Sequence, residues 1–327
     1  MDALSRIKQL GMPRRNDELW TFFPVSRIPA PEFPDACACE EDFAEEKDFA
    51  ALLPVALNAR ALKRTIADGE SEMALIKCNN DFGRTILDIG KQAKASIEIL
   101  DNKIPHPVCA ERFDVNVGEG ADVEIFFANP ANELPLAFRH FRITQAAGSS
   151  VRFSSIERGN GIARVSIDAF LNAPGAKFEI RTLNMLGGNS ESHHRLHIYH
   201  NAPETTSVQL SRNLLDGNSR ASYDGSVIVG NGCTKAFSSQ LVNTILLSED
   251  SSVSVKPVLK IYHDDVECTH GNTVGELDAE QMFYLVSRGI PEETAKRMLI
   301  SSFAKETFYP LPDSPAKKRL LQVLENG

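Results

Sequence analysis

The feature that most constrains the fold of this chain is a long block, roughly residues 95 to 265, in which short β-branched runs alternate with Gly, Asn and Pro. Runs of this kind bounded by turn residues are typical of β-strands. The clearest strand spans residues 253 to 261. Its odd-numbered positions are all apolar: Val253, Val255, Pro257, Leu259 and Ile261. Alternate residues of a strand share one face, so we expect these five side chains to point into a core.

Successive turns in this block lie about a dozen residues apart, a spacing common to β-sandwiches, β-barrels and stacked β-solenoids. The pattern does not choose among these three architectures. The block contains neither a strict internal repeat nor a Gly/Ser-rich linker that would divide it. We therefore predict one long β domain over residues 95–275.

The two flanks of this block have a different texture. Residues 1–94 combine short amphipathic pieces, Pro-rich turns and an acidic run from Glu40 to Asp48, which predicts a partly helical N-terminal region. Residues 276–327 predict a helical domain. Three helices are expected there, one capped by Asp278 and ended by Gly289, one starting at Pro291 and one following Pro315.

Composition limits the partners of the chain. Its 327 residues are 42% apolar and 24% charged, which suits a globular protein and excludes collagen-like and disordered classes. With 35 Lys and Arg against 44 Asp and Glu, the net charge is −9, so binding to nucleic-acid phosphates is not expected. No stretch reaches the ~18 uninterrupted apolar residues that span a bilayer, and the first twenty residues lack the apolar core of a secretion signal. We expect a cytoplasmic protein that binds neither nucleic acid nor membrane.

The densest group of potential metal ligands is the sequence His-Asp-Asp-Val-Glu-Cys-Thr-His-Gly at residues 263–271. If the strand continues, Cys268 and His270 share a face with Cα atoms ~6.6 Å apart. A thiolate beside an imidazole suits iron, zinc or copper(I). The alternative is that Cys268 is a small buried apolar residue and His270 a turn residue. Two ligands do not close a metal site, so a metal here would need donors from elsewhere in the chain or from a partner.

Other candidate sites carry weaker signals. Four histidines lie between His193 and His200, but the apolar residues among them favour a strand, where residues four apart are ~13 Å apart, so we interpret them as solvent-facing. Cys37 and Cys39 have no second pair at zinc-ribbon spacing. The chain has no phosphate-binding Gly-x-x-x-x-Gly-Lys-Ser/Thr loop, no Gly-x-Ser-x-Gly motif and no His-Glu-x-x-His motif, and we expect that it does not itself hydrolyse nucleotides.

From Ser211 onward the sequence resembles the SufB/SufD family of iron–sulfur cluster assembly proteins, and Gly11-Met-Pro13 with Glu18-Leu-Trp20 is similar to the opening motif of that family. The segments that carry the resemblance are Ser219 to Gly225, Asn243 to Ser248, Lys256 to Ile261, His263 to Gly271 and Phe283 to Ile290. Within the family, Cys-Thr-His-Gly at 268–271 looks like the SufD form, whereas SufB-type chains carry a His-Glu-Ala-like sequence there.

The resemblance implies a mainly β fold, a right-handed parallel β-helix flanked by an N-terminal helical region and a C-terminal helical domain. It implies a complex with one SufB and two copies of the ATPase SufC. The β-helix end near residues 243–270 would pair with SufB. There His270 and Cys268 would be ligands of transient iron or a nascent cluster shared with SufB, with no tightly bound cofactor. SufC would contact Phe283, Tyr284, Arg288, Gly289, Ile290 and Phe303.

The resemblance thus implies a scaffold subunit that is not itself an enzyme. A homodimeric scaffold that works without a separate SufB is the alternative within the family, and a homodimer of the isolated chain is left open. A β-helical enzyme acting on polysaccharides is a third reading. It would need an exported chain and a groove rich in aromatic residues, which 7% aromatic residues and one Trp do not favour.

Overall fold

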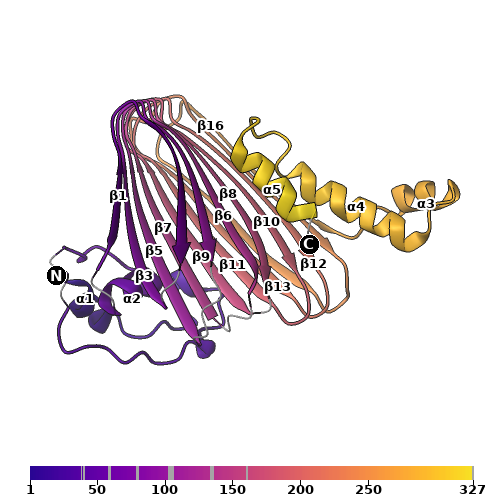
Figure 1. Cartoon of the computed structure of the whole chain (residues 1–327), viewed down its shortest axis with the longest axis horizontal. Coiled ribbons are helices and arrows are strands. Elements are labelled where there is room, and N and C mark those ends of the chain that lie inside the picture. Colours follow the sequence, from indigo (N-terminus) through magenta and orange to yellow (C-terminus); the bar gives the residue numbers. More distant parts are fainter. Residues whose placement is uncertain are drawn as a thin grey trace.

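The structure is a computed structural model that describes residues 1–37, 39, 41–57, 60–78, 81–101, 107–132, 136–159 and 161–325, without the side chains of 101 and 128–132. Within these residues the chain forms two eight-stranded parallel sheets. Sheet A contains the odd-numbered strands and sheet B the even-numbered ones, so the chain crosses from one sheet to the other after each strand (Figure 1). This is a parallel β-helix with two strands per coil, and the mainly β fold expected from the family resemblance is confirmed.

The strands are five to eleven residues long and follow each other along the solenoid axis. Sheet A consists of β1 (Leu62–Ile66), β3 (Phe82–Ile89), β5 (Val108–Val117), β7 (Leu136–Gln145), β9 (Ile162–Leu171), β11 (Glu191–His200), β13 (Arg220–Val229) and β15 (Ser252–Ile261). Sheet B consists of β2 (Ser71–Cys78), β4 (Lys94–Asp101), β6 (Asp122–Asn132), β8 (Ser150–Gly159), β10 (Lys177–Leu186), β12 (Thr206–Leu215), β14 (Ala236–Leu246) and β16 (Val266–Gly275).

Coil length explains why the sequence shows no strict repeat. Strands of neighbouring coils pair in register, but the offset between paired residues runs from 23, for Ser71 and Lys94, to 32, for Arg220 and Ser252. Glycine turns keep the coils stacked. A Cβ atom on Gly217, which has φ +63°, would lie 3.0 Å from the backbone of Gly188 in the coil before, so the close stacking of these two turns requires glycine at position 217.

The space between the two sheets is the main core. In the first coils it is filled by apolar side chains, with Phe113 stacked on Phe141 and Phe153 packed edge-on against Phe141. The register also shows which face of the strand over residues 253–261 points into the core. Val255 pairs with Tyr223, which lies in this core, so the predicted apolar face does point inward.

The N-terminal region packs on the outer face of sheet A. It contains α1 (Ala3–Leu10), two 3₁₀ turns (Glu18–Trp20 and Val25–Arg27) and α2 (Phe49–Leu57). These elements form a second apolar cluster with β5 and β7, in which Trp20 packs edge-on against Phe138. The guanidinium of Arg164 lies 4.0 Å from the Trp20 ring centre, a cation–π contact that fixes this segment to β9.

The C-terminal helices lie on the outer face of sheet B (Figure 1). α4 (Glu292–Glu306) and α5 (Pro315–Glu325) bury Phe308 and Leu320 against the outward residues of β6, β8, β10 and β12. By contrast, α3 (Ala279–Ser287) has no buried residue and projects away from the solenoid. α3 starts after its N-cap residue Asp278 and ends before Gly289, as predicted. The other two starts differ by one residue, since Pro291 is the N-cap residue of α4 and not its first residue, and α5 begins at Pro315 and not after it.

The strands begin at Leu62, earlier than the predicted start of the β domain at residue 95. β1 to β3 were therefore missed, because β1 has only five residues and charged residues interrupt β1 and β2. The division into domains at residues 94 and 275 remains a prediction.

Candidate functional site

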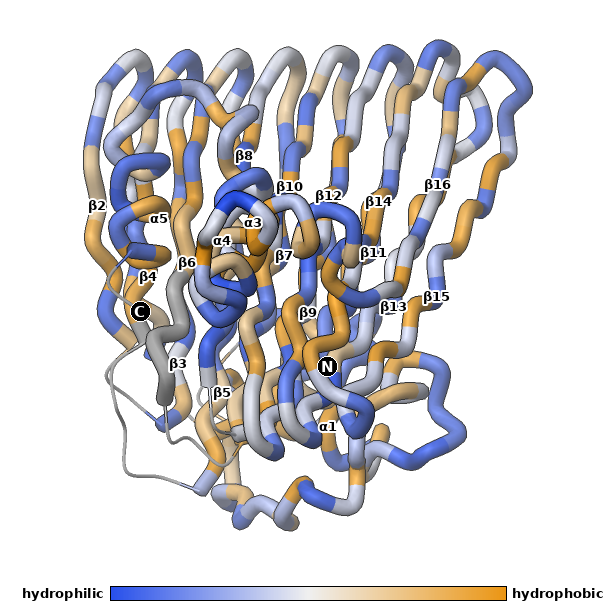
Figure 2. The backbone as a smooth tube through the Cα atoms, turned by 90° about the vertical axis from the view of Figure 1, so that its right-hand side faces the viewer, coloured by the Kyte–Doolittle hydropathy of each residue, from blue (hydrophilic) through white to orange (hydrophobic). Residues whose placement is uncertain are grey.

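One end of the solenoid is formed by β15 and β16, the last strand of each sheet (Figure 2). Each has a neighbouring strand on one side only. The inward residues of β15, which a further coil would bury, are only partly buried or exposed. Ile261, Tyr262 and Val274 are exposed large apolar side chains at this end. An edge of unpaired backbone groups with exposed apolar residues is a surface suited to another protein chain.

Cys268 and His270 lie on β16, on the face that points between the sheets. Cys268 pairs in register with Ser238 and His270 with Gln240, and both of these β14 residues are buried inside the solenoid. The predicted shared face of the two side chains is therefore confirmed. Cys268 is half-buried against an apolar cluster that includes Val229, whereas His270 is exposed at the open end. Burial raises the pKa of the Cys268 thiol.

Cys268 continues a polar ladder that crosses the core. His200 is fully buried, and its two ring nitrogens contact the hydroxyls of Thr205 at 2.7 Å and Ser207 at 2.9 Å. The hydroxyl of Ser207 contacts that of Ser238 at 2.8 Å, and Ser238 is the register partner of Cys268. Burial lowers the pKa of His200 to about 4, so this ladder is neutral at physiological pH.

His270 continues a second ladder. The hydroxyl of Tyr223 donates to Oε1 of Gln209 at 2.7 Å, and Nε2 of Gln240 donates to the same oxygen at 3.4 Å. Gln240 is the register partner of His270. Both predicted ligands thus stand one strand beyond a chain of buried polar groups, at the point where the interior meets the open end.

These ladder residues were not predicted, although the sequence contains a signal for them. Gln209, Gln240 and His270 are 31 and 30 residues apart, because 240 − 209 = 31 and 270 − 240 = 30. Ser207, Ser238 and Cys268 have the same spacing. Polar residues repeated at the coil length mark a ladder once the coil length is known, and only the structure supplies that length.

The interpretation of the histidine run as solvent-facing was wrong, although its assignment to a strand was right. His193, His194 and His200 are buried on β11, and His197 is half-buried. The error arose because both faces of β11 are covered. The interior lies on one side, and on the other the N-terminal segment places Phe23 against His193, with ring centres 5.1 Å apart.

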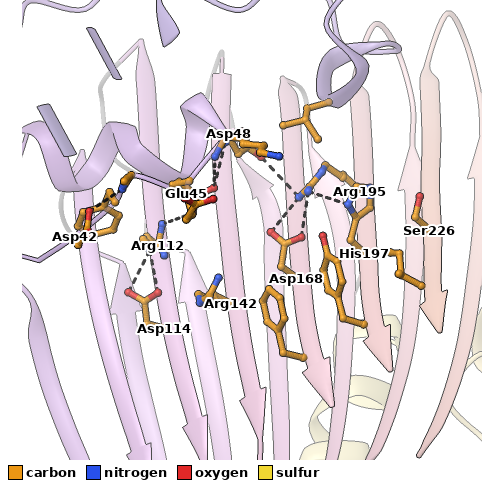
Figure 3. Close-up of a pocket in the computed structure, with 18 of the residues that line it drawn as sticks. Asp42, Glu45, Asp48, Arg112, Asp114, Arg142, Asp168, Arg195, His197 and Ser226 are labelled. Carbon is orange, nitrogen blue, oxygen red and sulfur yellow. Dashed lines mark hydrogen bonds and ion pairs between the residues drawn. The ribbon is translucent and has the colours of Figure 1, made fainter. Parts of the chain in front are cut away.

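A groove of about 1000 Å³ lies between the N-terminal segment and the outer face of sheet A (Figure 3). A row of polar side chains crosses its floor in register, formed by Arg142, Asp168, His197 and Ser226. Arg195 donates through Nη1 to Oδ2 of Asp168 at 3.2 Å and through Nη2 to Nδ1 of His197 at 3.0 Å. Nη2 also forms an ion pair with Oδ1 of Asp168 at 3.1 Å. Burial, and then the charge of Arg195, lower the pKa of His197 to about 3.

The acidic residues that line this groove are paired with arginines, so few of their carboxylate oxygens are available to a metal ion. Asp48 accepts from Arg164 at 2.9 Å, and Asp114 accepts from Arg84 at 3.0 Å and from Arg112 at 2.9 Å. Within the described ranges, no group of three or more His, Cys, Asp or Glu is placed to hold a metal ion. These ion pairs join the N-terminal segment to sheet A.

The residues predicted to contact the ATPase fall into two groups. Phe283 and Tyr284 on α3 are 75% and 57% exposed, and Arg288, Gly289 and Ile290 follow directly at the end of the same helix. The side chain of Phe303 faces the other way. It is half-buried on α4, and the guanidinium of Arg212 lies 4.6 Å from its ring centre. The structure therefore brings five of the six residues together on the projecting helix and its end.

A search of the described helices found none with the length and apolar character needed to cross a bilayer.

Residues 72–303 match the family model described as the SufBD core domain of the SUF system for FeS cluster assembly. The chain is 32% identical over 248 residues to the iron–sulfur cluster assembly protein SufD of Escherichia coli, covering 74% of this chain and 58% of that protein. It is 29% identical to SufD of Bacillus subtilis, covering 47% and 36%. An iron–sulfur cluster assembly SufBD family protein of Synechocystis is 30% identical, covering 56% and 40%.

The chain therefore spans about half the length of these relatives. The family model nevertheless covers β2 through most of α4, which includes the open end of the solenoid and the projecting helix. The resemblance to the SufD branch is confirmed by relatives that bear that name. From its fold and from these matches, the chain belongs to the SufB/SufD family of iron–sulfur cluster assembly proteins.

Proposed function

We propose that this chain is a scaffold subunit of an iron–sulfur cluster assembly complex, and that it pairs with a SufB-type chain through the open end of its solenoid. The observation that carries the proposal is the position of Cys268 and His270. They lie on one inward face of β16, the last strand of sheet B, where no further coil of the described residues covers them. A thiol and an imidazole are suitable donors for iron, which would be the cargo of the complex.

The partner would supply the donors that this chain lacks. Within the described residues no third His, Cys, Asp or Glu joins Cys268 and His270 in a metal-binding group. Three or four protein ligands are the usual number for a soft metal, so a site shared across an interface accounts for the shortfall. The free edges of β15 and β16 could pair with strands of the other chain, which would satisfy their backbone groups and bury the exposed apolar residues.

The ATPase SufC would dock on α3. Exposed Phe283 and Tyr284 are large aromatic residues of the kind that anchor protein interfaces, and the projecting helix presents them away from the solenoid. Phe303 would act indirectly, since it packs α4 against Arg212. ATP-driven movement of SufC would shift the helical domain and open the shared site. This requires that nucleotide-bound SufC prefers one of the two arrangements.

In this proposal the chain has no catalytic activity of its own and no tightly bound cofactor. Residues 1–94, 95–275 and 276–327 would serve as an N-terminal region, a β-helix core and a SufC-docking domain. A cytoplasmic location stays a prediction. The alternative is a scaffold that pairs with a second copy of itself, for which the same free strand edges would form the interface.

The test is anaerobic reconstitution of the complex co-expressed with the matching SufB and SufC chains. His270→Ala should abolish or strongly reduce cluster formation while the three chains still co-purify. His263→Ala is the matched control, because His263 lies in the turn before β16 and outside the inward face. Intact cluster formation in His270→Ala would remove the ligand role. Purification of the chain only as a homodimer, with no SufB bound, would favour the alternative.

A further inference from the structure

The carboxamide of Gln240 has one hydrogen-bonding atom that the described chain does not use. The side chain is 2% exposed, and its Nε2 donates to Gln209. Its Oε1 is buried and has no hydrogen-bond partner among the described residues. An unpaired buried acceptor is unfavourable, because it has lost its hydrogen bonds to water and gained none in return. A neighbouring donor that reached this oxygen would remove the cost.

The residue next to Gln240 on the open side is His270. The two are register partners on parallel strands, and both point inward. Within the described residues His270 makes no side-chain hydrogen bond. Register partners with polar side chains hydrogen bond repeatedly in this solenoid: Thr182 with Ser211 at 3.0 Å, Asn184 with Asn213 at 2.7 Å, and Ser207 with Ser238 at 2.8 Å.

The ladder behind Gln240 fixes which end of its carboxamide faces His270. Burial raises the pKa of the Tyr223 hydroxyl, so this group stays protonated and donates to Oε1 of Gln209. Gln209 therefore presents an acceptor, and Gln240 must turn its NH₂ group toward it. The oxygen of Gln240 remains available for a donor on the other side.

We propose that Gln240 is a positioning residue for His270. Its Oε1 accepts a hydrogen bond from the N–H of one ring nitrogen of His270, which leaves the lone pair of the other nitrogen free to bind ferrous iron. Histidine ligands of metals usually donate their second N–H to an oxygen in this way, which fixes both the tautomer and the ring orientation. This inference rests on the proposed function of His270, but formation of the hydrogen bond does not require iron.

The first test is the tautomer of His270 in the full-length chain, alone and bound to SufB, with ¹⁵N-labelled histidine and no iron. Long-range ¹H–¹⁵N correlation spectra in alkaline buffer report which nitrogen carries the proton. The wild type should show one predominant tautomer. Gln240→Met, which keeps the length of the side chain but removes the acceptor, should give the mixture of a free imidazole. A mixture in the wild type, or an unchanged single tautomer in Gln240→Met, would overturn the proposal.

Two further variants control for packing. Thr244→Val removes the last buried member of the neighbouring Asn184–Asn213–Thr244 ladder, whose β16 register partner is Val274, and should leave the His270 spectrum unchanged. Gln240→Glu retains an acceptor and should keep the single tautomer, which also covers the case in which Gln240→Met does not fold. An altered His270 spectrum in Thr244→Val, or a mixture in Gln240→Glu, would assign the effect to packing and overturn the proposal.

The second test is ferrous iron affinity in the assembled complex, by competition with a chelator. Gln240→Met should bind iron about 10–100-fold more weakly than the wild type, and Gln240→Glu should restore binding. An unchanged affinity in His270→Ala, together with a tautomer that responds to Gln240→Met, would refute the proposed function and leave the hydrogen bond standing. If the tautomer of His270 does not respond to Gln240→Met, the positioning role of Gln240 is refuted, whatever the effect of His270→Ala on iron affinity.

Discussion

Asp48 is the residue that most directly ties the N-terminal segment to sheet A. Its side chain is 1% exposed and accepts hydrogen bonds from Arg164 on β9 at 2.9 Å and from the backbone of Ala50 at 3.0 Å, while Arg195 lies 3.9 Å away. Burial alone would raise the pKa of Asp48, but the two arginines outweigh it and lower the pKa from 3.8 to about 2. The carboxylate is therefore the counter-charge for two buried cations.

Replacing Asp48 by Ala should lower the free energy of unfolding by about 3–5 kcal/mol, because it leaves Arg164 and Arg195 buried without this counter-charge. Urea unfolding followed by circular dichroism measures the change. Asp42→Ala is the matched control, since the Asp42 carboxylate pairs with the terminal amine at the surface and its loss should change little. Equal effects of the two substitutions would show that the Asp48 pair does not hold the segment.

The same pair predicts a pH dependence. The folded pKa of Asp48 is lowered, so its contribution to stability is complete above the unfolded pKa of 3.8 and is lost as the pH falls toward about 2. The difference in unfolding free energy between the wild type and Asp48→Ala should therefore shrink across this interval. Urea unfolding at a series of pH values measures it, and a difference that stays constant below pH 3.8 would contradict the lowered pKa.

Among individual residues, the sequence predicted correctly that Cys268 and His270 share a face, but it did not reveal the buried polar residues next to them. The i, i+2 spacing of Cys268 and His270 is enough to place them on one face of a strand, and β16 confirms this. Gln240 could not be linked to His270, because their pairing in register depends on a coil length that varies along the chain. The histidines of β11 were misplaced because alternation within one strand does not reveal that both of its faces are covered.

Helix α3 is suited to bind a partner and contributes little to the packing of the fold. None of its residues is buried, and its packing contact is with α4. Asp278 caps its first turn through the backbone amides of Glu280 and Gln281, so the helix is defined locally without support from the solenoid. These capping residues are also why its bounds could be predicted from sequence.

The double substitution of Phe283 and Tyr284 by Ala should abolish co-purification of SufC while the unfolding midpoint of the chain changes by little. Tyr309→Ala is the matched control, because Tyr309 is 54% exposed but follows α4 rather than lying on α3. Pull-down with tagged SufC, alongside thermal unfolding, measures both effects. Full retention of SufC by the double variant would contradict docking on α3. Point substitutions are preferable to deletion after Asp278, which would also remove the buried Phe308 and Leu320.

At the scale of the whole molecule, stability should vary along the solenoid axis, because each coil contacts only its neighbours. The central coils are packed on both sides, whereas β15 and β16 are packed on one. The outer faces of the sheets also differ along the axis, because the N-terminal elements and the C-terminal helices pack on strands that precede β15 and β16. The alternation of residues 253–261 predicted a core-facing strand but not that this core would be open.

Hydrogen exchange should therefore be faster in β15 and β16 than in β8 to β12 of the isolated chain, and should slow in β15 and β16 when SufB is bound. Mass spectrometry of exchanged peptides measures this along the chain. If β15 and β16 are protected as strongly in the isolated chain as in the complex, SufB does not cover these strands.

The architecture itself could not be derived from turn spacing, which fits three β folds, and was reached through the family resemblance. Coil lengths between 23 and 32 residues hide the repeat that would otherwise identify a solenoid. Once stacked, those coils place the inward face of residues 266–275 at a free end of the solenoid.

Thiol labelling of the native chain can show whether the open end, with Cys268, is the surface that SufB covers. Among the described residues, Cys37 and Cys268 are the half-buried cysteines and the other four are buried. Cys37 lies in the N-terminal region and Cys268 at the open end. An alkylating reagent followed by peptide mass spectrometry should modify Cys268 in the isolated chain and much more slowly in the complex with SufB, while Cys37 is labelled equally in both. Equal labelling of Cys268 with and without SufB would contradict the claim that the open end is the shared site.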